Sequence, residues 1–338
     1  MLRNGGNEMK KSIALLGGFS LVLLILSVCF FYQPVSGIPK DLPRYACIVC
    51  APEEGYWGKV KEGIRLADED FHTSTRISGF SILDSARQVE LLKEVEYLNL
   101  DGVITVGDPD ILELNTIISQ MESDDIPVVL IDTDSAQSGR SCYIGTDNYE
   151  AGRLAAEEIL NRIDGDVHVA VLATGMEKSY QAERLRGFQA ALEDSGRAEI
   201  LEVCVNEQDK FSLMERITYL TETYDSMNAM FCAEASTTQY IGLAGNSLAS
   251  LRDLVIIGFD DLDATLQAIR NGFLDATIIQ DAQAMGYEAV RYLSSHAGHR
   301  TGRTETQNSD RFEPIAAGNL YTKIQIVTAD NVDTYKIP

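Results

Sequence analysis

The sequence predicts an α/β protein built as two doubly wound parallel-sheet lobes, and three observations support that prediction. Apolar runs alternate with amphipathic stretches of helical period almost to the end of the chain. The runs are rich in valine, isoleucine and leucine without strict apolar–polar alternation, which is typical of strands buried on both faces. At 338 residues, of which 45% are hydrophobic, the chain is long enough to bury two separate cores.

The strand-like runs fall into two successive groups, and each group predicts one sheet. The first group comprises the runs at 45–51, 76–83, 102–106, 127–131 and 142–145, with helices expected at 57–71 and 85–99. The second group comprises the runs at 167–172, 200–205, 229–232, 254–258 and 276–279. Because the same rhythm restarts after the fifth run, we expect a second sheet that resembles the first.

A basic, apolar N-terminal segment predicts export across a membrane. Arg3, Lys10 and Lys11 precede an uncharged run from Ile13 to Tyr32, close to the roughly 20 residues that span a bilayer. The positive charges should stay in the cytoplasm, so the rest of the chain is expected to be extracytoplasmic. Three fates of this segment remain open: an uncut anchor, a signal peptide cleaved near Val35–Gly37, or a lipoprotein signal ending at Cys29.

Charge and cysteine content exclude several classes of protein. There are 51 acidic and 28 basic residues, and the net charge of −23 repels phosphate backbones, so we expect no nucleic-acid partner. Most of the six cysteines lie in apolar runs, where they are expected to be small buried hydrophobes. Cys47 and Cys50 would point to opposite faces of a strand, which argues against a redox C-x-x-C motif.

Motifs for catalysis and for cofactor binding are missing from the sequence. No glycine-rich phosphate loop follows a strand, and there is no G-x-S-x-G nucleophile elbow. The pair His296-x-x-His299 lies in a polar stretch without a zinc-protease motif. We therefore expect no enzymatic activity, no cofactor and no metal site.

The ends of the predicted strands are unusually polar and aromatic. Ligands of open parallel sheets bind beyond the carboxyl ends of the strands. Carboxylates and carboxamides hydrogen-bond vicinal hydroxyl groups, while tyrosine and tryptophan faces cover the C–H surface of a sugar ring. The pattern predicts a carbohydrate site. The residues at these ends are Glu53, Glu54, Tyr56, Trp57, Asp132, Glu234, Asp260 and Gln280.

Each of these residues also has a structural explanation. Tyr56 and Trp57 could simply pack on the strand, and Asp132 and Asp260 could be helix N-caps, a common use of aspartate before a helix. Glu53 and Glu54 could be a solvated pair, and Gln280 a hinge or cap residue. Arg184 lies within a predicted helix, where an arginine is usually a surface residue.

The order of several short motifs resembles the ribose-type periplasmic sugar-binding proteins and the effector-binding cores of lactose-repressor-like regulators. The resemblance extends from Tyr45 to Tyr335. Its motifs are Tyr56-Trp57, Asp101-Gly102-Val103-Ile104, Ile126-Pro127-Val128-Val129 before Asp132, Ile144-Gly145-Thr146-Asp147-Asn148 with Gly152, Arg184-x-x-Gly187-Phe188, Ile257-Gly258-Phe259-Asp260, Ala276-Thr277-Ile278-Ile279-Gln280 and Ile326-Val327-Thr328 with Asn331-Val332-Asp333.

The resemblance implies a type I periplasmic binding protein fold, in which a three-stranded hinge joins two lobes. The crossings would fall near Thr146-Asp147, Gln280-Asp281 and Thr322-Lys323. Neither lobe would then be contiguous in sequence. The implied organisation is a signal or anchor segment at 1–37, an N-terminal lobe at 38–146 plus 281–322, and a C-terminal lobe at 147–280 plus 323–338.

Ligand contacts follow from the resemblance, position by position. The first lobe would contribute Glu54, Tyr56, Trp57 and Asp132; the second would contribute Arg184, Glu234 and Asp260, with Gln280 at a crossing. Two positions that are asparagine in ribose-type proteins are Glu54 and Glu234 here, and the arginine that usually follows the first-lobe aspartate is Thr133. This acidic set favours a neutral or amine-bearing sugar over an anionic one.

The implied function is the capture of a small sugar between the lobes by a monomer. The bound form would be presented to the permease of an ABC importer or to a sensor kinase or chemoreceptor. The alternative is the effector-sensing core of a lactose-repressor-like transcription regulator, which would need a helix-turn-helix region of about 60 residues in front. In this sequence an apolar segment occupies that place.

Overall fold

The structure is a computed structural model that describes residues 42–50, 55–80, 84–174, 179–205, 210–244, 251–297 and 318–335. The helices and strands that it describes belong to the unit Pro43–Pro338. The predicted export segment Ile13–Tyr32 lies outside the described residues. Among the residues that are described, no helix has both the length and the apolar character needed to cross a membrane.

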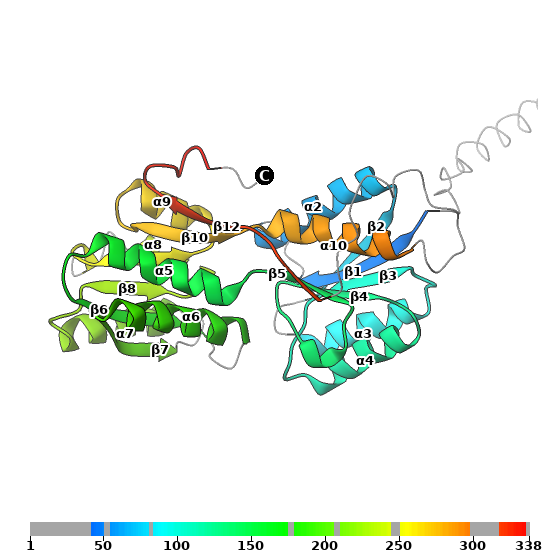
Figure 1. Cartoon of the computed structure of the whole chain (residues 1–338), viewed down its shortest axis with the longest axis horizontal. Coiled ribbons are helices and arrows are strands. Elements are labelled where there is room, and N and C mark those ends of the chain that lie inside the picture. Colours follow the sequence, from blue (N-terminus) through cyan, green and yellow to red (C-terminus); the bar gives the residue numbers. More distant parts are fainter. Residues whose placement is uncertain are drawn as a thin grey trace, which may run out of the picture. The chain divides into compact units, whose positions relative to one another are not determined.

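The first sheet has six parallel strands in the order β11-β5-β4-β3-β1-β2 (Figure 1). This order is doubly wound, because the strands on either side of β1 and β3 are reached by crossovers in opposite directions. The edge strand beside β5 comes from near the end of the chain. The strands are β1 (Arg44–Cys50), β2 (Ser74–Phe80), β3 (Gly102–Thr105), β4 (Val128–Ile131), β5 (Cys142–Gly145) and β11 (Gly318–Tyr321).

The second sheet repeats this arrangement in the order β12-β10-β9-β8-β6-β7. One strand departs from the expected parallel pattern, since β12 runs antiparallel to β10. Only Thr322 and Lys323 separate β11 from β12, so no crossover helix returns the chain to the parallel direction. The strands are β6 (Val167–Ala173), β7 (Ala198–Val205), β8 (Ala229–Cys232), β9 (Val255–Phe259), β10 (Ala276–Gln280) and β12 (Ile324–Thr328).

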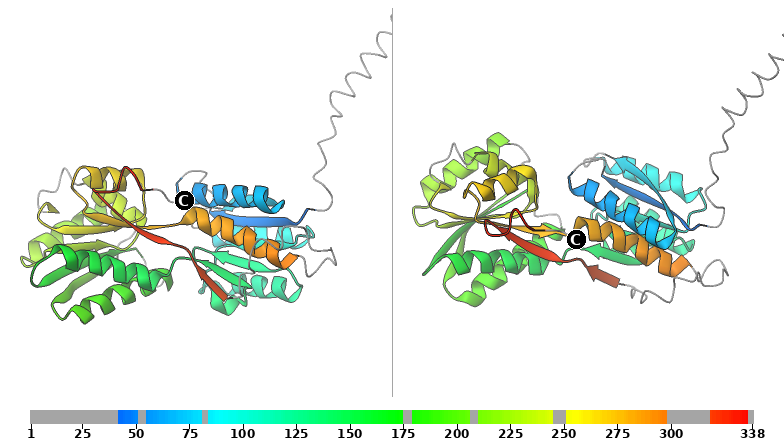
Figure 2. Two further views of the ribbon diagram at one scale, coloured as in Figure 1. Left: turned by 45° about the horizontal axis from the view of Figure 1, so that its top comes forward. Right: turned by 90° about the horizontal axis from the view of Figure 1, so that it is seen from above.

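Helices cover both sheets, and two pairs of them pack very closely. Helix α10 follows the second sheet in sequence but lies beside α2 over the first one (Figures 1 and 2); α5 packs on α6 in the same way. The described helices are α2 (Tyr56–Phe71), α3 (Ser85–Glu96), α4 (Leu112–Ser123), α5 (Asn148–Arg162), α6 (Ser179–Ser195), α7 (Lys210–Thr223), α8 (Ala235–Ala244), α9 (Asp263–Arg270) and α10 (Ala282–Ala297), with a 3-10 turn at Ala136–Ser138.

Glycines make these close helix pairs possible. A Cβ atom on Gly63 would lie 1.9 Å from the carbonyl oxygen of Gln283, and one on Gly152 would lie 1.9 Å from that of Arg184. Any larger side chain at either position would push the two backbones apart. The first pair fixes α10 against α2, and the second fixes α6, which contains Arg184, against α5.

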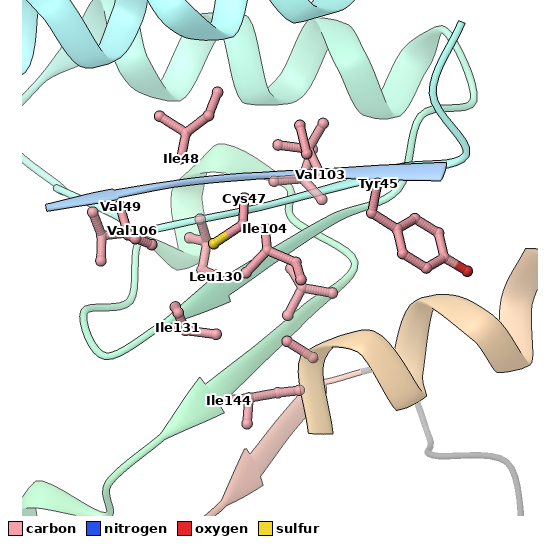
Figure 3. Packing of buried hydrophobic residues seen from close by; sticks show 14 of the residues in the cluster. Tyr45, Cys47, Ile48, Val49, Val103, Ile104, Val106, Leu130, Ile131 and Ile144 are labelled. Atoms are coloured by element: carbon pink, nitrogen blue, oxygen red, sulfur yellow. The ribbon is translucent and has the colours of Figure 1, made fainter. Parts of the chain in front are cut away.

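Each sheet has its own hydrophobic core. Strand β1 is buried on both faces: Ile48 lies on one side, and Tyr45 and Cys47 lie on the other (Figure 3). This explains why the run lacks apolar–polar alternation. The expectation that the cysteines are small buried residues is confirmed for the five that the structure describes, which are Cys47, Cys50, Cys142, Cys204 and Cys232.

The prediction of two α/β lobes is confirmed, with small shifts in the bounds of elements. The strand predicted at 76–83 begins at Ser74 and is described as far as Phe80, and the helix predicted at 85–99 ends at Glu96. The three passages of the chain between the sheets leave β5, β10 and β11. The exact lobe boundaries remain a prediction.

Candidate functional site

Asp132 is held in an unusual backbone conformation at the end of β4. Its φ is 65°, in the left-handed region that asparagine and aspartate tolerate better than other non-glycine residues. Its backbone amide donates to the carbonyl of Ile144 at 3.3 Å, and its carbonyl accepts from the hydroxyl of Tyr143 at 2.8 Å. Both backbone groups are thus bonded to β5, which fixes the backbone of Asp132 at the end of β4.

Asp260 has the same geometry at the end of β9. Its φ is 63°, its amide donates to the carbonyl of Ile278 at 2.8 Å, and its carbonyl accepts from the hydroxyl of Thr277 at 2.7 Å. Neither aspartate caps a following helix: the N-cap of α9 is Leu262, and that of the 3-10 turn is Ser135. The alternative that these residues are helix N-caps is therefore wrong.

Tyr56 and Trp57 form an aromatic pair at the first turn of α2. Their rings meet edge to face, with centroids 5.2 Å apart and an interplanar angle of 88°. The hydroxyl of Tyr56 donates to Oδ1 of Asp132 at 2.6 Å. Burial, together with the nearby Asp132 carboxylate, raises the pKa of Tyr56 well above its ordinary value, so the hydroxyl remains a donor at neutral pH.

Arg184 is buried within α6, with 3% of its surface exposed, so the sequence-based view of it as a surface residue is wrong. Its Nη2 and Nε donate to Oδ1 of Asn148 at 2.7 and 3.3 Å, and its Nη1 donates to the carbonyl of Ala233. The guanidinium carbon lies 3.3 Å from the ring centroid of Phe259. Burial lowers the pKa of Arg184, while the neighbouring Asp260 opposes that shift.

Gln280 links the second sheet to the segment that leaves the first. Its Nε2 donates to Oδ1 of Asp260 at 2.9 Å, and its Oε1 accepts from the hydroxyl of Thr146 at 2.6 Å. Both ends of the carboxamide are therefore in use. This fixes Asp260 relative to one of the predicted crossings.

The carboxylate of Glu234 is bonded within its own turn. Oε1 accepts from the backbone amide of Thr237 at 2.9 Å, from the Thr237 hydroxyl at 3.1 Å and from the hydroxyl of Ser236. This arrangement caps the beginning of α8. Glu54, the other predicted acidic contact, lies outside the described residues.

The predicted contacts form two groups that interact electrostatically. One group contains Tyr56, Trp57 and Asp132. The other contains Arg184, Asp260 and Gln280. Desolvation by burial raises the pKa of Asp260 to about 7, and the negative charges of Asp261 and Asp132 add to this effect, against the bond from Gln280 and the charge of Arg184. The guanidinium of Arg184 can donate to hydroxyl groups of a ligand, and the carboxylates of Asp132 and Asp260 can accept from them.

The sequence did not identify several residues that support the predicted contacts. Asn148 and Phe259 belong to the motifs quoted for the resemblance, but their roles beneath Arg184 depend on contacts between elements that are distant in sequence. Lys59 on α2 forms an ion pair with Asp261, whose Oδ2 also accepts from the hydroxyl of Tyr335 at 3.1 Å. Nothing in the local sequence identifies this triad.

Thr133 directly follows Asp132 in the chain and bonds to its carboxylate. Its hydroxyl donates to Oδ2 of Asp132 at 3.0 Å. Within the described part of the chain, no group of three or more histidine, cysteine or acidic residues is placed to hold a metal ion.

Comparisons with known proteins agree with this architecture. The ribose import binding protein of Bacillus subtilis (strain 168) is 22% identical over 293 residues, covering 82% of this chain and 90% of that protein. Among solved structures, a sugar-binding protein of a sugar ABC transporter from Bacillus halodurans is 28% identical, with a TM-score of 0.77 over 87% of this chain and 99% of that one. The XylFII–LytSN complex is 25% identical with a TM-score of 0.70, over 86% and 99%.

The match to a family model covers all of both sheets except Arg44 and the last strands, β11 and β12. The model of the periplasmic binding protein domain matches residues 45–301, which is more than half of the chain and includes every described site residue. Known type I periplasmic binding proteins share the two-lobed fold seen here. The chain therefore belongs to the family of the periplasmic binding protein domain.

Proposed function

We propose that this protein is an extracytoplasmic solute-binding protein that captures a small sugar between its two lobes. One observation supports this most directly: Asp132, bonded to Tyr56, and Asp260, beside the charge of Arg184, lie at the carboxyl ends of equivalent strands. The two carboxylates also influence one another electrostatically. Ligands of such sheets bind at these ends. The family and its sugar-binding relatives agree with this function.

The chemistry of these residues favours a neutral or amine-bearing sugar. Carboxylates accept hydrogen bonds from hydroxyl groups, and Arg184 supplies donors. The Tyr56–Trp57 pair offers an edge-to-face aromatic surface for a sugar ring. Including Glu54 and Glu234, the proposed contacts have more negative than positive charge, so a sugar acid or phosphosugar should be repelled.

The proposed lobes comprise residues 38–146 plus 281–322 and residues 147–280 plus 323–338. The sheet membership of β11 and β12 supports this division, because the last crossing lies between them. Binding energy would favour the arrangement in which both lobes contact the ligand. That form would then be recognised by a membrane partner, either an importer or a sensor, and the export segment would keep the protein outside the cytoplasm, anchored or secreted.

A thermal-shift screen tests the proposal. The full chain, purified in a mild detergent, is heated with neutral pentoses and hexoses, aminosugars and sugar acids, because a ligand of the folded state raises the melting temperature. Trp57→Ala and Asp260→Ala should abolish the shift. Asp263→Asn is the matched control, since this exposed carboxylate lies on the first turn of α9.

Two outcomes would contradict the proposal. If both site variants respond to the sugar as the parent does, the site assignment is wrong. If calorimetry shows that a sugar acid binds more tightly than its neutral parent, the ligand class is wrong even though the binding function stands.

A further inference from the structure

A cavity of about 490 Å³ adjoins the proposed sugar site without including any of its predicted contacts. This volume lies within the roughly 300–1,000 Å³ range of small-molecule sites. Tyrosine is the most prominent side chain in the lining, represented by Tyr143, Tyr149, Tyr180 and Tyr321. Aromatic faces in a solvent-accessible cavity are suited to the C–H surfaces of a sugar ring.

Three hydrogen bonds connect the cavity to the proposed site. In each bond one partner lines the cavity and the other is a predicted sugar contact. The two regions therefore border one another at these side chains. The bonds join the hydroxyl of Tyr143 to the carbonyl of Asp132 at 2.8 Å, Oδ1 of Asn148 to Nη2 of Arg184 at 2.7 Å, and the hydroxyl of Thr146 to Oε1 of Gln280 at 2.6 Å.

The charged groups in the lining are already engaged with other protein groups. Asp134 is paired with Arg140, which does not line the cavity, through bonds of 2.5 and 2.7 Å. Glu183 is paired with Arg186, whose guanidinium carbon lies 4.7 Å from the ring centroid of Tyr149.

The remaining acidic residue of the lining, Asp147, accepts from the backbone amide of Glu150 at 3.0 Å as the N-cap of α5. A neutral, hydroxylated occupant fits such a lining better than an ion does, because no charge there lacks a partner.

We propose that this cavity is a second sugar subsite, so that the ligand is a disaccharide or a glycoside with one ring in the proposed site and its neighbour here. The inference rests on the proposed function and extends it to a larger ligand. Tyr149 and Tyr321 are the rings to test, because neither takes part in the three hydrogen bonds that connect the cavity to the proposed site. Tyr321 is half exposed, as expected at the mouth of such a cavity.

Calorimetric titration of the full chain in detergent provides the test. The probes are glucose, galactose, xylose and arabinose, each beside a disaccharide built from it. At least one disaccharide should bind about tenfold more tightly than its monosaccharide, since an additional stacked ring is worth roughly that factor. Tyr149→Ala and Tyr321→Ala should each weaken disaccharide binding about five- to tenfold and leave monosaccharide binding unchanged. Tyr97→Ala, at an exposed tyrosine outside the cavity, is the control.

The outcomes separate this inference from the function on which it rests. If monosaccharides bind but every disaccharide binds more weakly, the second subsite does not exist, while the sugar-binding function stands. The subsite is equally overturned if both tyrosine variants reduce the two affinities by the same factor. If no sugar of either size binds, the proposed function itself is wrong.

Discussion

Asp132 and Asp260 are structural counterparts, one at the end of a strand in each sheet. Their φ angles are 65° and 63°, and each backbone amide donates to a carbonyl on the next strand of its own sheet. A side-chain hydroxyl from that same strand then bonds each aspartate's carbonyl. The carboxylates have bonds of their own: that of Asp132 accepts from the hydroxyls of Tyr56 and Thr133, and Oδ1 of Asp260 accepts from Nε2 of Gln280.

The raised pKa of Asp260 predicts that stability falls as pH rises. Its pKa in the folded protein is about 7, above the ordinary aspartate value, so the folded state retains a proton that the unfolded state releases. The free energy of unfolding should therefore decrease between about pH 4 and pH 7. Asp260→Asn should raise the melting temperature more at pH 8 than at pH 4, measured by circular dichroism.

Ligand affinity should change with pH in the opposite direction. A sugar hydroxyl donates to an ionised carboxylate, so binding favours deprotonated Asp260, and affinity should rise as pH increases from 6 to 8. The groups that act on this carboxylate are Arg184, Gln280, Asp261 and Asp132. Asp260→Asn should bind more weakly and lose the pH dependence in calorimetry. If the dependence instead survives in Asp260→Asn and disappears in Asp132→Asn, the titrating group has been misassigned.

The strand ends could be predicted from the sequence because the rule behind them is topological. Once 127–131 and 254–258 are identified as buried parallel strands, Asp132 and Asp260 must lie at the carboxyl edge. Local sequence could not exclude that both were helix N-caps, because that depends on where the next helix begins. The backbone bonds to β5 and β10 decide the question.

The environment of Arg184 illustrates what sequence could not supply. An arginine on a helix is usually exposed. Its burial here depends on Asn148, a carbonyl at Ala233 and the ring of Phe259, none of which is its neighbour in sequence. Similarly, the reversal of β12 depends on a two-residue connection that only the pairing of β11 with β5 makes evident. The resemblance placed Arg184 at the site, but the reason for its position is tertiary.

The ion pair between Lys59 and Asp261 should stabilise the ligand-bound arrangement. It joins α2, which covers the first sheet, to the end of β9 in the second, and the side chains are 35% and 14% exposed. Lys59→Met should weaken sugar binding about two- to fivefold, as expected for a partly exposed pair. Asp261→Asn should do the same, and the double variant should be no weaker than either single one.

Calorimetry of these three variants gives the coupling between the two residues. Lys61→Met, on the same helix, is the control and should bind sugar like the parent. Fully additive losses in the double variant would show that Lys59 and Asp261 act independently of one another.

The close packing of α5 on α6 should connect stability to ligand binding. A Cβ at Gly152 would meet the carbonyl oxygen of Arg184 at 1.9 Å, so Gly152→Ala must separate the helices and displace Arg184. We expect a loss of about 1–3 kcal/mol in the free energy of unfolding, together with weaker sugar binding. Gly102→Ala, at the start of β3, is the control, because the atoms nearest to its added Cβ belong to the side chain of Leu293 on α10 and not to a backbone. Gly102→Ala should reduce stability in urea without changing sugar affinity. If Gly152→Ala and Gly102→Ala change sugar affinity equally, the link between the helix packing and Arg184 is wrong.

Tyr45→Phe tests the packing of the hydrophobic core around the first sheet. Its side chain is fully buried, and within the described part of the chain its hydroxyl has no hydrogen-bond partner. Removing an unsatisfied polar group from a core is neutral or favourable, so Tyr45→Phe should raise the free energy of unfolding by up to about 1 kcal/mol. Tyr292→Phe is the matched variant, since that buried hydroxyl donates to the carbonyl of Ser141 at 3.2 Å, and it should lower the value by about 1 kcal/mol. Urea unfolding measures both. If the two variants lose the same stability, the Tyr45 hydroxyl forms a hydrogen bond in solution, and the packing of β1 against α10 differs from the arrangement described here.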